Sequence, residues 1–193
     1  MRNYFVYAWT MLDPFYYRIT RLTYIPHYNE QFKNIFRVRL TSYKGAPFTL
    51  SDETKINKHD TLVKIHLHNI RLLNEMNSFQ TDIQKARYVY KIVQQSLPGL
   101  ANYIQSHSKK EQIKGIVGIT TLNKGCDRLG FESFDITNSF YKWWKMIPFF
   151  SINLLSTPNA SFSSVKKKKP KYIFMSKDSL LHSYKEKFAK LSL

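Results

Sequence analysis

The sequence is poor in several features that classify a protein at once. It has a single cysteine, Cys126, so no disulfide can form within the chain, which is typical of a reducing compartment. No apolar run reaches the roughly 18–20 residues that a membrane-spanning helix needs. Acidic residues are scarce, 13 against 30 basic ones, and the resulting formal net charge of +17 favours contact with polyanions. Asp13-Pro14 interrupts the apolar start of the chain, which has no small-residue cleavage site, so we expect a cytoplasmic protein.

Signatures of catalysis and cofactor binding are missing as well. The chain has no GxSxG, GxGxxG, P-loop, HExxH or CxxC pattern, so we expect no cofactor. His66 and His68 share one face of a predicted strand, but no third ligand follows at a recognisable spacing, and we predict no metal site. Cys126 lies near Lys124 and Arg128 at a predicted helix start, which could lower its pKa; simple packing is the alternative.

What the chain does contain is enough apolar sequence for one full core. Hydrophobic residues make up 43% of 193 residues, a globular proportion at a length that suits one domain. Alternating or continuous apolar runs predict five strands, at residues 34–45, 61–69, 114–122, 131–136 and 171–175. The third run is apolar nearly throughout, which predicts a central strand.

Helical periodicity fills the stretches between these strands. We predict an aromatic helical segment over 1–22, a helix over 81–107, a short helix over 123–131, an aromatic helix over 139–155 and a final helix over 176–190. Thr81 and Ser176 are the expected N-caps, and Pro98-Gly99 would either split or kink the 81–107 helix. Strands interleaved with helices predict a single α/β or α+β domain, 1–193, with a small mixed sheet flanked by helices.

Basic and aromatic residues gather in the last third of the chain. A Ser- and Lys-rich stretch, 156–171, is expected to be a flexible basic loop. The expected anion-binding residues are Lys142, Lys145, Lys166, Lys167, Lys168, Lys169 and Lys171, and the expected membrane contacts are Trp143, Trp144 and Phe149. Aromatic and basic side chains together are typical of an interfacial membrane helix. They also suit a surface that stacks single-stranded nucleic acid, and a purely solvated loop beside a packed helix remains a third interpretation.

The stretch "VKIHLHN", Val63 to Asn69, is the most unusual polar pattern. Its apolar positions point to one face and its basic positions to the other. Bracing of the strand end is the simpler role for this stretch, since an Asn readily caps a following turn. The order strand, short helix, strand over 114–136 is similar to the later half of the acetyltransferase fold, which would bring coenzyme A as cofactor.

Several stretches together resemble the YkoP-like domain family of spore-forming bacteria, which also occurs fused to polysaccharide deacetylases. They are "LDPFYYRITRL", "VRLTSYKG", "TLSD", "KHDTLVKIHLHN", "KGIVGITTLNKGCDRLGF" and "YIFMSKDSLLHSY", in order along almost the whole chain. Asp60, His66 and Asn69 match the family pattern "GD…ELH…N", whereas His59 and Lys64 replace its Gly and Glu. The resemblance therefore makes His66 and Asn69 the candidate catalytic residues.

The resemblance implies an α/β domain associated with envelope or spore glycan genes. We therefore interpret the chain as an accessory protein of that metabolism, binding an anionic membrane surface or an acidic glycan, with the inner face of the membrane as the expected place of contact. One alternative is an acyltransferase with His66 as general base; another is a nucleic-acid-binding protein. The oligomeric state stays open.

Overall fold

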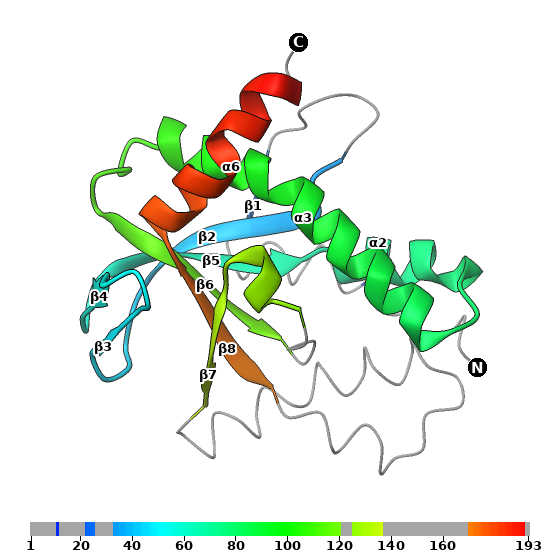
Figure 1. The fold of residues 1–193 in the computed structure, drawn as a ribbon, viewed down its shortest axis with the longest axis horizontal. Coiled ribbons are helices and arrows are strands. Elements are labelled where there is room, and N and C mark those ends of the chain that lie inside the picture. The colour runs from blue at the N-terminus through cyan, green and yellow to red at the C-terminus, as the bar shows by residue number, and fades with distance from the viewer. Residues whose placement is uncertain (1–10, 12–21, 26–32, 121–124, 137–169, 192–193) are drawn as a thin grey trace.

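The structure is a computed structural model that describes residues 11, 22–25, 33–120, 125–136 and 170–191 (Figure 1). The predicted α/β class is confirmed. Within the described ranges the strands are β1 (Thr23–Tyr24), β2 (Phe36–Ser42), β3 (Phe48–Thr49), β4 (Lys55–Ile56), β5 (Thr61–Leu67), β6 (Ile113–Thr120), β7 (Glu132–Asp135) and β8 (Lys171–Ser176). The helices are α2 (Asn69–Glu75), α3 (Asp82–Ser106) and α6 (Lys177–Leu191), with short 3₁₀ turns η1 (Met76–Ser78) and η2 (Asp127–Leu129).

Six strands form one mixed sheet in the order β1-β2-β5-β6-β8-β7. Only the β5–β6 pair is parallel among the described strands; the others are antiparallel. The connection between these two parallel strands contains α2 and α3, as a parallel crossover requires. β6 lies between β5 and β8, so its apolar run is buried by strands on both edges, as the sequence predicted.

Helices α3 and α6 pack against each other over one face of the sheet (Figure 1). The alternating positions Val63, Ile65 and Leu67 of β5 face these helices; Val63 and Ile65 belong to the main core, and the partly buried Leu67 packs against it. Leu97, Leu100 and Ile104 of α3 complete that core, and all three are fully buried. Packing of this apolar helix face supplies most of the stability of such a helix.

A small hairpin, β3–β4, covers part of the opposite sheet face. Its buried Leu50 and Ile56 pack on Leu62, Val117 and Phe174. The polar residues between the two strands also anchor it: the Ser51 backbone N–H and hydroxyl donate to Glu132 Oε1 at 2.9 and 2.8 Å, and the Ser176 hydroxyl donates to Asp52. The hairpin therefore closes a second, smaller core on the face away from α3.

The helix boundaries follow their capping residues. Thr81 caps α3, where a capping box with Gln84 confirms the prediction. The Ser176 hydroxyl accepts the Ser179 N–H at 2.9 Å, which confirms the expected cap of α6. The possible split at Pro98-Gly99 is wrong, because α3 runs through Pro98, which is buried against the sheet layer. Tertiary packing outweighs the lost N–H of a single proline here.

Other predictions differ from the structure or lie beyond its described part. The short helix expected over 123–131 is only the 3₁₀ turn η2, ended by Gly130 in a left-handed conformation (φ 88°). Lys171, counted at the end of the basic loop, is the first residue of β8. The 1–22 segment apart from Met11 and Leu22, the 139–155 helix and the 156–169 stretch lie outside the described residues.

Candidate functional site

Four basic residues lie together on the sheet face opposite α3, and we name them the cationic sheet face: Arg37, Arg39, Lys64 and His66. β2 and β5 are antiparallel neighbours, and their register places Arg37 directly opposite His66 and Arg39 directly opposite Lys64. Along β5 this face continues from Leu62, which lies under the hairpin, to Lys64 and then His66. The cationic positions thus begin where the apolar cover by Leu50 and Ile56 ends.

These side chains differ in their exposure. Arg37 is only 3% exposed, and its guanidinium lies over the ring of Tyr24 at 4.9 Å from the ring centroid. Arg39, Lys64 and His66 are half-buried. Like charges directly opposite each other disfavour strand pairing, so the Arg39–Lys64 pair is unusual in a sheet.

His66 and Asn69, the two candidate catalytic residues, lie in different elements. His66 belongs to the cationic sheet face, whereas Asn69 is the first residue of α2. The expectation that Asn69 caps this helix is wrong: the N-cap is His68, which makes no side-chain cap bond. The His68 N–H instead donates to the Ile35 carbonyl at 2.9 Å, and its ring lies 5.8 Å from that of Tyr24.

His66 lies toward the edge of the sheet at which β6 ends. β5 and β6 are adjacent and parallel, and Lys64 pairs with Val117. His66 therefore follows this pair toward the same edge of the sheet where β6 ends at Thr120.

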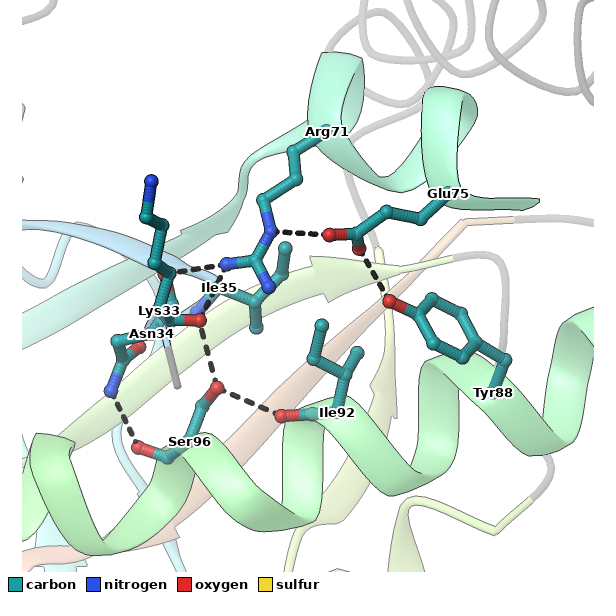
Figure 2. Close-up of polar contacts among 8 residues, drawn as sticks. All are labelled: Lys33, Asn34, Ile35, Arg71, Glu75, Tyr88, Ile92 and Ser96. Carbon is teal, nitrogen blue, oxygen red and sulfur yellow. Dashed lines mark hydrogen bonds and ion pairs between the residues drawn. The ribbon is translucent and has the colours of Figure 1, made fainter. Parts of the chain in front are cut away.

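A polar network attaches α3 to the beginning of β2 (Figure 2). Asn34 donates to the Ser96 carbonyl at 2.9 Å and accepts the Phe36 N–H at 2.9 Å. The Ser96 hydroxyl accepts the Ile35 N–H at 3.1 Å and donates to the Ile92 carbonyl at 2.8 Å. Asn34 and Ser96 are both buried, so these bonds satisfy backbone groups that water does not reach.

The same region ties α2 to α3. Arg71 forms an ion pair with Glu75 at 2.8 Å, and its guanidinium also donates to the Lys33 carbonyl. The Tyr88 hydroxyl donates to the other oxygen of Glu75 (Figure 2). Burial, followed by the hydrogen bond to Glu75, raises the pKa of Tyr88 to about 12. Glu75 therefore bridges the two helices as an acceptor, which is a structural role.

The sequence analysis missed this network, although one signal was present. Arg71 and Glu75 are four residues apart, the spacing of an ion pair on one helix face. Asn34 and Ser96 had no comparable signal, because they are single polar residues within apolar segments that only the fold brings together.

Asp60, one of the residues that match the family pattern, fixes a turn. Its carboxylate accepts the Asn57 N–H at 2.7 Å, and its own N–H donates to the Asn57 carbonyl at 3.1 Å. Within this turn His59 has a positive φ of 75°, a conformation that favours glycine. The geometry thus supports a bracing role for Asp60 at the start of β5.

Cys126 does not have the environment of an activated thiol. Burial, together with the neighbouring Asp127, raises the pKa of Cys126. The lowered pKa considered from the sequence is therefore wrong, because desolvation disfavours the thiolate. A search of the described residues also found no group of three His, Cys, Asp or Glu side chains that could hold a metal ion.

Most of the predicted anion- and membrane-contact residues cannot be placed. Lys142, Lys145, Trp143, Trp144, Phe149 and Lys166–Lys169 lie outside the described residues. Lys171 is described, and its ammonium lies 3.5 Å from an oxygen of Asp135 on the neighbouring strand β7. Within the described ranges, none of the helices combines the length and hydropathy that a membrane crossing needs.

The molecule is thus a single α/β domain with a helix-covered sheet face and a cationic face beside a small hairpin. The chain matches the YkoP domain family over residues 2–184 and belongs to it. It is 43% identical to the "Uncharacterized protein YkoP" of Bacillus subtilis (strain 168), over 97% of this chain and 100% of that protein. No solved structure matches it significantly, and the acetyltransferase-like later half is not confirmed. β7 pairs with β8 at the sheet edge and does not lie next to β6.

Proposed function

We propose that this YkoP-family protein is a binding module for an anionic partner of the bacterial envelope, either a membrane surface or an acidic glycan. The observation that carries this proposal is the cationic sheet face, in which two registered cross-strand pairs are both basic. The net charge of +17 and the basic stretch at 166–169 support it, because both attract the same kind of partner. The protein acts on the cytoplasmic side of the membrane in this proposal.

Arginine and lysine fit the proposed partner in different ways. A guanidinium binds a phosphate or carboxylate through two parallel hydrogen bonds, whereas an ammonium acts as a point charge. No specific observation on the described residues favours the acyltransferase alternative with His66 as base.

Co-sedimentation with lipid vesicles tests the proposal. The protein should bind phosphatidylglycerol vesicles more tightly than phosphatidylcholine vesicles, and raised salt should release much of it, because the attraction falls within a Debye length of about 8–10 Å. A basic residue near an anionic surface contributes about 1 kcal/mol, so the double variant Arg39→Gln/Lys64→Gln should bind the anionic vesicles roughly 10-fold or more weakly. An acidic glycan replaces the vesicles in a parallel arm.

A matched control keeps the loss of two charges but moves it to another surface. Arg87 and Lys91 are exposed on α3, so Arg87→Gln/Lys91→Gln should bind nearly as the parent protein does. A third variant, with Lys166–Lys169 changed to Gln, measures how much the basic stretch contributes to vesicle binding. Equal, weak binding to both vesicle types and to the glycan would reject the proposal. Tighter, steeply salt-dependent binding to an oligonucleotide would favour the nucleic-acid alternative instead.

A further inference from the structure

A cavity of about 460 Å³ lies where three segments meet, and we name it the charged cavity. The β3–β4 hairpin, the beginning of β6 with its preceding turn, and the first turn of α6 form its walls. It shares no residue with the cationic sheet face or with the network of Figure 2. Its volume is at the lower end of the range for small-molecule sites.

Charged side chains dominate the walls of this cavity. Three are acidic and three are basic: Glu53, Glu111, Asp178, Lys55, Lys114 and Lys177. Within the part of the chain that the structure describes, none of these six forms an ion pair with another residue. The Lys177 ammonium donates only to the Lys110 carbonyl, at 3.2 Å. The cavity therefore gathers both signs of charge at one place without the pairs that would neutralise them.

The walls are held in fixed positions relative to one another. The bond from Ser176 to Asp52 joins the hairpin to the start of α6, and the Thr54 N–H donates to Asp52 as well, at 3.1 Å. Between these contacts Glu53 has a left-handed backbone (φ 66°), which non-glycine residues rarely adopt and which is enriched at binding sites. A preformed site of this kind loses less freedom when a ligand binds.

The charge pattern limits what can bind. A simple anion would meet three carboxylates, and a simple cation would meet three ammonium groups, so neither gains a net attraction. A molecule that carries both charges can place its carboxylate near Lys114 or Lys177 and its ammonium near Glu53 or Glu111. The first turn of α6 adds the positive end of a helix dipole next to Lys177. Ile113 is the one apolar residue among those that line the cavity in the described structure, which favours a small polar ligand.

We propose that the charged cavity binds a small zwitterionic ligand, a free amino acid or short peptide that has an ammonium and a carboxylate group. The proposal concerns a different site from the cationic sheet face, so either one can fail without the other. Nuclear magnetic resonance titration of the full chain with the dipeptide Ala-Ala, N-acetyl-Ala-Ala and Ala-Ala amide tests it. Ala-Ala should bind saturably with a Kd on the order of 1 mM, and each blocked peptide at least about fivefold more weakly.

Two double variants test which side chains contact each end of the ligand. Glu53→Gln/Glu111→Gln should weaken the binding of Ala-Ala until its affinity is no higher than that of the N-acetyl peptide. Lys114→Gln/Lys177→Gln should weaken the binding of Ala-Ala until its affinity is no higher than that of the amide. Control variants Asp82→Asn and Lys91→Gln change exposed charges on α3 and should leave all three affinities unchanged. Equal affinity for blocked and free peptides, no saturable binding of Ala-Ala, or unchanged affinity in the cavity variants would overturn the proposal.

Discussion

Two non-glycine residues, Glu53 and His59, have left-handed backbones, with φ of 66° and 75°. A backbone hydrogen bond holds each of them: the Glu53 N–H donates to the Leu50 carbonyl at 3.0 Å, and the His59 N–H donates to the Tyr43 carbonyl at 2.8 Å. Glu53 lines the charged cavity, whereas His59 is not among its lining residues. The strain at His59 is therefore the easier of the two to remove.

Replacing His59 with Gly should raise the free energy of unfolding. A left-handed conformation costs an L-residue about 1–2 kcal/mol, whereas the extra backbone freedom of an unfolded Gly costs about 0.5–1 kcal/mol. The net gain expected for His59→Gly is thus about 0.5–1 kcal/mol, measured by urea unfolding. Lys58→Gly is the matched control at the preceding position, which does not have a positive φ. This variant should lose stability. A less stable His59→Gly protein would contradict the assignment of strain.

At the scale of elements, the contact between α3 and the start of β2, which we name the seam, depends on polar atoms as well as on apolar packing. Ser96 is fully buried and satisfies the Ile35 N–H, which belongs to the chain just before β2. Gly99 lies close by, and a Cβ there would come within 2.6 Å of the Asn34 amide nitrogen. Helix and strand therefore approach closely at this point, which leaves no room for water to replace a lost bond.

Ser96→Ala should lower the free energy of unfolding by about 1–3 kcal/mol, because it leaves the buried Ile35 N–H without an acceptor. The matched control is Ser106→Ala on the same helix. Ser106 also donates to the carbonyl four residues earlier, Asn102, at 2.9 Å, but it is exposed and contacts no other element through this bond. The free energy of unfolding of Ser106→Ala should therefore differ from that of the parent protein by less than about 0.5 kcal/mol. Equal losses in the two variants would show that the seam does not depend on Ser96.

At the scale of the whole molecule, the charge excess opposes folding. The compact state holds a formal net charge of +17 in one domain, so like charges repel more strongly than in the expanded chain. Salt screens this repulsion before it affects buried contacts, since buried pairs are screened much less.

The Tm should therefore rise when NaCl is increased from low to moderate concentration. Going from about 0.02 M to about 0.3 M shortens the Debye length from roughly 20 Å to roughly 6 Å. A gain of about 1 kcal/mol would raise the Tm by about 2–4 °C for a domain of this size. Sodium sulfate at equal ionic strength should raise the Tm further, because sulfate is also excluded from the protein surface and strengthens apolar burial. A Tm that stays constant or falls with NaCl would contradict this view.

Much of the fold was predictable because local patterns determine it. Alternating and continuous apolar runs identified β2, β5, β6, β7 and β8, and side-chain caps identified the starts of α3 and α6, since both depend on near neighbours in sequence. The two-residue strands β1, β3 and β4 have too few positions for a period, so they were not predicted. The continuity of α3 through Pro98 was decided by its packing on the sheet.

The candidate sites also combine features that local sequence determines with features that only tertiary packing determines. The sequence by itself determined that Lys64 and His66 share one face of β5, because side chains alternate along any strand. Only the tertiary structure placed Arg37 and Arg39 opposite them, since the pairing and register of β2 with β5 depend on the whole sheet. The charged cavity joins residues 53–57, 111–114 and 177–178, which no local pattern relates. Their proximity is a property of the folded chain, because segments far apart in sequence meet only when burial of the core brings them together.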